Sequence, residues 1–334
     1  MLSRVADSIY WMNRYMERAE NVARFVDVHL HLQLDAAFGA DEQWAPILAT
    51  TGDHAAFDER YPAPTRESVL RFLSFDEDNP NSIVSCLRAA RENARAVREI
   101  ISSEMWEQVN RAYLMVRDAA GSDALESPHE FFTDVKKASQ LFVGITYLTM
   151  THSEAWHFGR LGRLLERADK TSRILDVKYF LLLPTVNDVG LAYDDIQWSA
   201  LLKSASAFEM YRKKHGLLTP TKVVEFLLLE GKFPRAIRYC IVKAERSIYA
   251  ITESPMKMGE SPAERAIGAM RATLDAGDVQ GIVGGGLHEY LDAFQTRLNA
   301  ASEAIYETFF ALRPLAPAAP SVAPPPMSQS QSQG

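Results

Sequence analysis

The chain has 334 residues, enough for one large domain or two ordinary ones, and 47% of them are hydrophobic, as in proteins that bury a core. Its formal charge is −7, from 36 basic and 43 acidic side chains, which argues against a nucleic-acid partner because phosphate contacts need a basic face. The start shows no secretory signal, and no apolar stretch reaches the roughly 20 residues that cross a bilayer. Two cysteines in a chain of this length fit a reducing compartment. A cytoplasmic protein without a membrane segment is therefore expected.

The first half of the chain reads as a series of amphipathic helices. In the segment 3–34, Met12, Met16 and Ala19 fall in one apolar arc at about 100° per residue, and the first Gly or Pro comes only at Gly39. Asn79-Pro80 is a helix start signal, a capping residue followed by proline. Further helices are expected at 43–51, 65–75, 81–102, 105–118 and 128–151.

The second half repeats the first. The long helical segment 158–183 matches the opening helix at an offset of 149 residues, with seven of the fifteen positions 14–28 identical. These identities are Arg14, Glu17, Arg18, Ala19, Arg24, Asp27 and Val28 with Arg163, Glu166, Arg167, Ala168, Arg173, Asp176 and Val177. Later matches keep the same order, among them Gln43-Trp44 with Gln197-Trp198, Cys86 with Cys240, and His129 with His288. The sequence therefore predicts a tandem duplication.

These patterns predict an all-α fold, because no alternating strand pattern occurs between the turns. We expect a helical bundle of about ten to twelve helices with pseudo-twofold symmetry, since two copies of one unit pack most naturally about such an axis. Residues 1–151 form the first half and residues 152–313 the second, packed with the first as one compact unit. Residues 314–334, rich in Pro, Ala, Ser and Gln, are expected to be a disordered tail.

The repeated charged faces of the two long helices are the candidate site. They comprise Arg14, Glu17, Glu20, Arg24, Arg163, Glu166, Asp169 and Arg173. One interpretation is structural, with Glu20–Arg24 and Asp169–Arg173 as helical ion pairs worth only about 0.2–0.5 kcal/mol each. In the other, both faces line a common cleft that binds a ligand or partner, or they hold one another as a buried network. In an enzyme, Glu17 or Glu166 would be the catalytic acid or base.

No metal site and no cofactor are predicted. Di-iron bundles take a Glu from each of two helices and a Glu-x-x-His motif from each of two more, and here only Glu154 to His157 has that spacing. Three more histidines do not complete a ligand set: His29, His31 and His152.

Two pairs of matching residues are expected to be structural. Cys86 and Cys240 lie on apolar faces and are interpreted as buried free thiols. His129 and His288 fall in the first turns of their helices, where capping or packing is favoured over catalysis. No nucleophile elbow or phosphate loop is present, so whether the chain is an enzyme stays open, with a non-catalytic role favoured.

The opening MLSRVADSIYWMNRYMERAENVARFVDV resembles the bacterial alpha-E domain family, an all-helical group without an established activity. The stretch FGRLGRLLERADKTSRILDVKY at 158–179 and the segments 195–198 and 225–240 also resemble that family, over about residues 1 to 313. The family's acidic helix positions fall on Glu17, Glu20 and Glu166, with Asp169 in place of a glutamate. The resemblance supplies no catalytic residues.

The resemblance does imply partners. Members occur beside, or fused to, circularly permuted ATP-grasp proteins of the carboxylate–amine ligase type, and often beside transglutaminase-like proteases. The expected function is therefore that of a non-catalytic accessory or adaptor protein in a pathway that makes or modifies peptide-like amide bonds. The alternative is an enzyme or small-ligand-binding protein that uses the paired Glu/Arg faces. Assembly into a homo-oligomer stays open.

Overall fold

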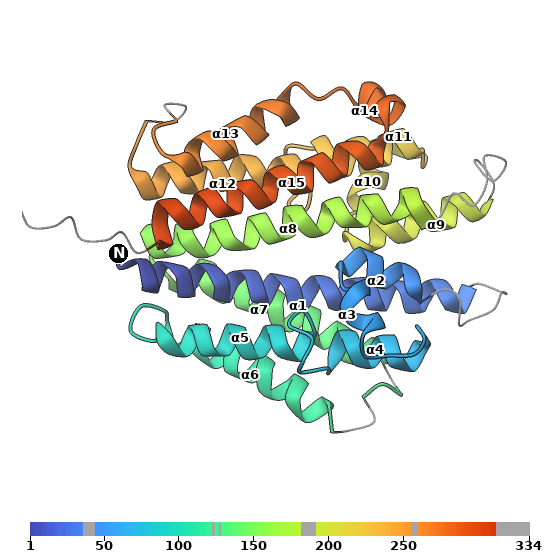
Figure 1. Cartoon of the computed structure of the whole chain (residues 1–334), viewed down its shortest axis with the longest axis horizontal. Coiled ribbons are helices and arrows are strands. Elements are labelled where there is room, and N and C mark those ends of the chain that lie inside the picture. Colours follow the sequence, from blue (N-terminus) through green and yellow to red (C-terminus); the bar gives the residue numbers. More distant parts are fainter. Residues whose placement is uncertain (36–43, 122–123, 127, 182–191, 256–258, 312–334) are drawn as a thin grey trace, which may run out of the picture.

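The computed structural model describes residues 1–35, 44–121, 124–126, 128–181, 192–255 and 259–311 (Figure 1). These residues form fifteen α-helices and no strand, so the all-α prediction is confirmed and the predicted count of ten to twelve helices is too low. The excess comes from helices of one or two turns, such as α3 (His54–Asp58) and α14 (Val279–Gly285), which are too short to show a helical period in the sequence. The predicted tail, 314–334, lies outside the described residues.

The long helices of each half follow the predicted order. The first half contains α1 (Ser3–Asp35), α2 (Ala45–Thr51), α3, α4 (Arg66–Ser74), α5 (Ile83–Ala96), α6 (Ser103–Ala119) and α7 (Pro128–Thr149). The second half contains α8 (Glu154–Leu181), α9 (Ala192–Ser204), α10 (Phe208–His215), α11 (Pro220–Leu229), α12 (Ile237–Thr252), α13 (Pro262–Asp275), α14 and α15 (Leu287–Ile305), the last continued by a π-helical turn at Tyr306–Phe310. None of the described helices is long and apolar enough to cross a membrane.

The start predicted for α5 is wrong by two residues. Ser82, not Asn79, caps this helix, because the Ser82 hydroxyl accepts a hydrogen bond from the backbone N–H of Ser85. Asn79 instead closes the preceding turn, where its side-chain amide donates to the carbonyl oxygen of Phe72 at 3.1 Å. An Asn-Pro pair therefore marks the turn that leads into the helix.

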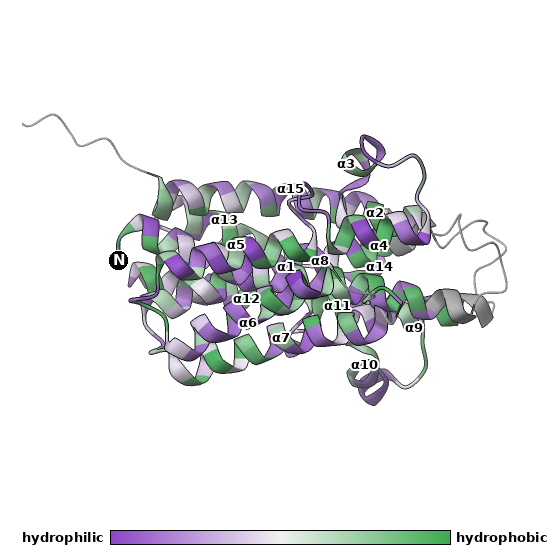
Figure 2. Ribbon diagram, turned by 90° about the horizontal axis from the view of Figure 1, so that it is seen from below, coloured by the Kyte–Doolittle hydropathy of each residue, from purple (hydrophilic) through white to green (hydrophobic). Residues whose placement is uncertain are grey.

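Helices α1 and α8 lie side by side along the centre of the molecule (Figure 1). Helices α5 and α7 pack on α1, α12 and α15 pack on α8, and α6 and α13 form the outer layer on either side. The short helices cross over, since α2 packs on α8 and α9 packs on α1. Most helices carry both hydrophilic and hydrophobic residues, as amphipathic helices of a bundle do (Figure 2). The predicted duplication would produce this repeated packing; the duplication and the boundary at residues 151 and 152 stay predictions.

The predicted buried thiols are confirmed. Cys86 on α5 and Cys240 on α12 are free and fully buried. Burial raises the pKa of each thiol to about 12, so neither is a thiolate at neutral pH. Both cysteines therefore act as small core residues.

Two glycines on α8 let its backbone approach α1 closely. A Cβ atom at Gly162 would overlap the carbonyl oxygen of Tyr10, and one at Gly159 would lie 2.6 Å from Nδ2 of Asn13. A side chain at Gly162 would therefore move the helices apart, whereas one at Gly159 would displace the Asn13 side chain. The close approach allows the charged side chains further along both helices to reach across the contact.

Gly162→Ala should destabilise the protein, because the added methyl group meets a backbone carbonyl oxygen that cannot rotate away. We expect the free energy of unfolding to fall by about 1–3 kcal/mol, the usual cost of overpacking, in urea denaturation. Gly144→Ala on α7 is the matched control, because a Cβ there meets nothing within 4 Å. Alanine is favoured over glycine in helix interiors by about 1 kcal/mol, so the control should be stabilised. Equal effects at the two positions would contradict the close contact.

Candidate functional site

The Glu-Arg dipeptides 17–18 on α1 and 166–167 on α8 pair reciprocally. Arg18 donates to Glu166 through Nε at 2.7 Å and Nη2 at 3.0 Å. Arg167 donates to Glu17 in the same two-bond manner, at 2.8 and 2.6 Å. Both glutamates are buried, with at most 1% of their surface exposed. Each helix thus supplies the glutamate of one pair and the arginine of the other.

Arg235, between α11 and α12, joins two carboxylates of α1. Its Nη1 lies 3.2 Å from Glu17 Oε1, and its Nη2 lies 2.5 Å from Glu20 Oε1. Glu20 also accepts two hydrogen bonds from Arg24, at 2.9 and 2.6 Å, and one from the hydroxyl of Ser139 on α7 at 2.8 Å. Each of these glutamates is therefore held by two guanidinium groups.

The acids of α8 have a similar environment. Glu166 accepts a hydrogen bond from Arg14 Nε at 2.9 Å in addition to the pair described above. Lys170 Nζ lies 3.7 Å from Glu166 and 3.2 Å from Asp169. Asp169 also accepts from Arg173 Nε, at 3.1 Å. The helical pairs predicted for Glu20 and Asp169 are thus present, as parts of a larger network.

The outer arginines reach the short helices of the opposite halves. Arg24 donates to the hydroxyl of Ser206, just beyond α9. Arg173 lies against Gly52 at the end of α2, where a Cβ would come 2.9 Å from its Nη1. Both contacted residues have left-handed backbones, with φ of +48° at Ser206 and +82° at Gly52. The two arginines therefore extend the charged contact of α1 and α8 towards the short helices α9 and α2.

Arg163 is the exception among the eight predicted residues. Arg163 makes no ion pair or hydrogen bond with any described residue, whereas the other seven belong to two neighbouring ion-pair clusters of the α1/α8 contact. One cluster holds Glu17, Glu20 and Arg24 with Arg167 and Arg235, and the other holds Arg14, Glu166, Asp169 and Arg173 with Arg18 and Lys170. Burial and the neighbouring Arg167 lower the pKa of Arg163 to about 10. Arg14, at the matching position of α1, binds both Glu166 and the hydroxyl of Tyr10.

Four cationic members of the network are absent from the predicted set: Arg18, Arg167, Lys170 and Arg235. The signal for Arg18 and Arg167 is in the sequence, because both belong to the repeated Glu-Arg dipeptide. Arg235 lies outside both long helices, and no spacing relates it to Glu17 or Glu20. Only the three-dimensional packing of α12 against α8 brings it there.

The cations keep the buried carboxylates ionised. Burial by itself would raise the pKa of Glu20, but the guanidinium groups of Arg235 and Arg24 outweigh burial and lower it to about 2. Burial opposes ionisation of Glu166 too, and Arg18 and Arg14 nevertheless hold its pKa well below the usual value. A general acid or base works best when its pKa is near the operating pH. These two glutamates are therefore poorly suited to proton transfer.

A cleft of about 590 Å³ lies beside this network, between α1, α7 and α9. Its ionisable lining residues are Arg24, Asp27, His31, Lys136, Asp195 and Lys203. Of the predicted site residues only Arg24 lines it. Asp27 is held at its wall by Lys136, whose Nζ lies 2.6 Å from Oδ2, and by His129, whose Nδ1 lies 2.8 Å from Oδ1.

The model of the alpha-E family, described as a predicted alpha-helical domain with a conserved ER motif, matches residues 1–310. The chain belongs to the alpha-E family. This alpha-E chain is 26% identical over 293 residues to an uncharacterized protein of Mycobacterium bovis and to one of Mycobacterium tuberculosis. Each match covers 81% of this chain but 32% of the relative, so the chain spans about a third of the length of these relatives. No solved structure matches it.

Arg14→Met and Arg163→Met compare matching positions of the two long alpha-E helices. Arg14→Met removes one of the two guanidinium groups on buried Glu166, so the free energy of unfolding should fall by about 1–3 kcal/mol. Arg163→Met removes a partly buried charge without an acidic partner among the described residues, and stability should be unchanged or increased. Urea denaturation measures both. A greater loss for Arg163→Met would contradict the assigned pairing.

The pH dependence of stability in Glu20→Gln tests whether the buried Glu20 carboxylate is ionised. Because the pKa of Glu20 is about 2 in the fold against an ordinary value of 4.5, its ionisation stabilises the protein fully above about pH 4.5. That contribution is lost as the pH falls from 4.5 towards 2. The difference in unfolding free energy between wild type and Glu20→Gln should shrink over this window in denaturation curves at each pH. A difference that stays constant down to pH 2 would be incompatible with the lowered pKa.

Proposed function

We propose that the chain is a non-catalytic accessory or adaptor domain that acts with an ATP-grasp carboxylate–amine ligase, in a pathway that also uses a transglutaminase-like protease. The observation that carries the proposal is that arginine side chains already bind the glutamates of the paired Glu/Arg faces. Glu17, Glu20 and Glu166 are buried, and each is held by two guanidinium groups. Charges enclosed and neutralised in this way serve the fold, since a catalytic carboxylate must reach its substrate.

The family description supports the same interpretation. It names a conserved ER motif, and we infer that this motif is the pair of dipeptides at 17–18 and 166–167. Their side chains bind one another across the helix contact. What the family retains would then be the contact that joins the two long helices, not a reacting group.

The length of the relatives supports an accessory role. The alpha-E region accounts for about a third of these mycobacterial proteins, so in them it works next to further protein within one chain. We infer that the alpha-E region of this chain likewise acts next to another protein domain. The family resemblance supplies the class of that partner, the ATP-grasp ligase.

The test is whether the purified chain binds the ATP-grasp ligase of the same organism. Binding is measured by calorimetry and by co-elution in size-exclusion chromatography. We expect a stable complex, and neither ATP hydrolysis nor amide hydrolysis by the chain alone. Glu17→Gln, shown to be folded by circular dichroism, is the control for activity. Turnover by the purified chain that disappears in Glu17→Gln would overturn the proposal, as would failure to bind the ligase.

A small-ligand-binding role is the second candidate, and the cleft favours it. Its volume of about 590 Å³ lies within the range of about 300–1,000 Å³ that is usual for ligand sites. Its lining holds three cations, Arg24, Lys136 and Lys203, against the two acids Asp27 and Asp195, an excess of positive charge that suits carboxylate or phosphate groups. Raised thermal stability of the isolated chain with such anions, lost in Lys203→Met, would favour this role over the adaptor.

A further inference from the structure

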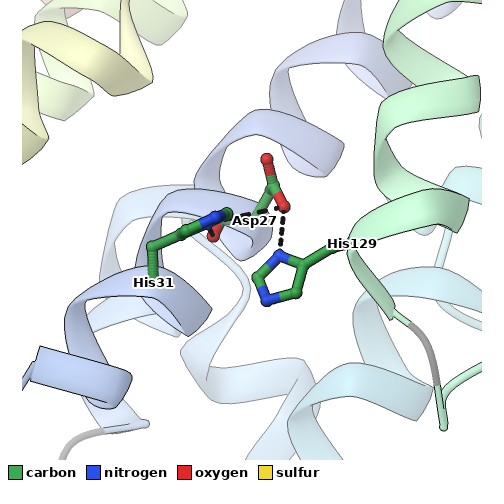
Figure 3. A group of neighbouring side chains, drawn as sticks. All are labelled: Asp27, His31 and His129. Atoms are coloured by element: carbon green, nitrogen blue, oxygen red, sulfur yellow. Dashed lines mark hydrogen bonds and ion pairs between the residues drawn. The ribbon is translucent and has the colours of Figure 1, made fainter.

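Three possible metal ligands meet beside the cleft (Figure 3). Asp27 and His31 come from α1, and His129 comes from the first turn of α7. Asp27 Oδ1 lies 2.8 Å from His129 Nδ1 and 3.8 Å from His31 Nδ1. One ligand atom from each residue lies within 4.8 Å of the other two, and the imidazole rings are 4.1 Å apart between centroids.

We propose that Asp27, His31 and His129 bind a divalent transition-metal ion of the zinc class. Imidazole nitrogen and carboxylate oxygen are preferred zinc ligands. A tetrahedral ion with bonds of about 2.0–2.1 Å holds its ligand atoms about 3.4 Å apart. The observed separations of 2.8 and 3.8 Å lie on either side of that value, so small rotations of the side chains complete the site.

The helix arrangement favours this geometry. Asp27 and His31 are four residues apart and lie on one face of α1, the spacing that also places two zinc ligands together in the H-E-x-x-H motif. The third ligand comes from another helix, as ligands of bundle metal sites do. His31 Nδ1 also lies 2.7 Å from the backbone oxygen of Asp27, a contact that the ring gives up when it turns towards the ion.

Lys136 orients the carboxylate. Its ammonium group binds Asp27 Oδ2 at 2.6 Å and leaves Oδ1 towards the two histidines. Partners of this kind fix the ligand orientation in known metal sites and are nearly as important as the ligands. The buried position of Asp27 has the same effect, because its side chain has little room to rotate.

The second half has no histidine at the sequence position that matches His31. Asp176 and His288 repeat the Asp27–His129 contact, with Oδ1 and Nδ1 2.6 Å apart. At the offset of 149 residues, however, the counterpart of His31 in the sequence is Phe180. The Asp–His contact is therefore common to both halves, whereas the histidine that completes the ligand set is specific to the first.

The site is open on the side of the cleft. Asp27 and His31 line the cleft, so the fourth position of an ion with three protein ligands faces it. Arg24 and Lys203 line the same space and would attract an anion towards the ion. The ligand class that fits is therefore a zinc-class ion carrying water or a small anionic group.

The test is titration of the chelator-treated full chain with zinc chloride, followed by competition with a chromogenic chelator. We expect one zinc ion per chain, and an affinity at least about tenfold lower in His31→Ala and in His129→Ala. Cobalt substitution should give the visible absorption of a tetrahedral site. His288→Ala, which changes the matching histidine, should bind zinc like wild type.

The His31→Ala variant makes the test decisive, because the His31 side chain is 61% exposed and its removal should leave the fold intact. No zinc binding by wild type would overturn the proposal. Unchanged affinity in a folded His31→Ala would place the ion elsewhere and would also overturn it. The ligase takes no part in the measurement, so the result is independent of the proposed adaptor function.

Discussion

The fold depends on two buried arginine–glutamate pairs exchanged between α1 and α8. Moving a charge out of water costs several kcal/mol, and only good geometry with further hydrogen bonds compensates it. Here both pairs are bidentate, and each glutamate has a second guanidinium. A shift of one helix along the other by a single turn would break both bidentate pairs. The pairs therefore specify one register of the central helices.

The remaining layers are positioned by this register. Arg235 binds Glu17 and Glu20 and so joins α1 to the segment before α12. Ser139 binds Glu20 and joins α1 to α7. Arg24 donates a hydrogen bond to Ser206 beyond α9, and Arg173 lies against Gly52 at the end of α2. The close approach at Gly159 and Gly162 fixes the distance between the central helices that these contacts need. Polar contacts thus specify the arrangement of a bundle that apolar burial stabilises.

The sequence predicts the long helices and the charged faces because both are periodic within one segment. It does not predict which charges pair, since that depends on how α1 and α8 cross. Arg14 lies three residues before Glu17 on its own helix, yet it binds Glu166 on the other helix. The sequence predicts no ligand set for His31, because His129 is distant from it in the sequence and only the packing of α7 on α1 brings the two histidines together.

The difference between Arg14 and Arg163 follows from charge balance. At the offset of 154 residues, Arg235 corresponds to Asn81, which accepts a hydrogen bond from Arg18 and carries no charge. Glu17 therefore receives its second guanidinium from Arg235, whereas Glu166 receives its second one from Arg14. Arg163 is left without an acidic partner in the part of the chain that the structure describes. This difference between the halves is compensated within the network.

The difference at His31 and Lys136 has no such compensation. Their counterparts at the offsets of 149 and 159 residues are Phe180 and Gln295, so the first half places two additional ionisable groups beside Asp27. Neither group is needed for the Asp–His contact, because Asp176 and His288 form it in the second half. Two features that the halves share, the Glu-Arg pairs and the Asp–His contacts, join the long helices to each other and to α7 and α15. Uncompensated differences, which collect beside the cleft, are where a function specific to this chain should be sought.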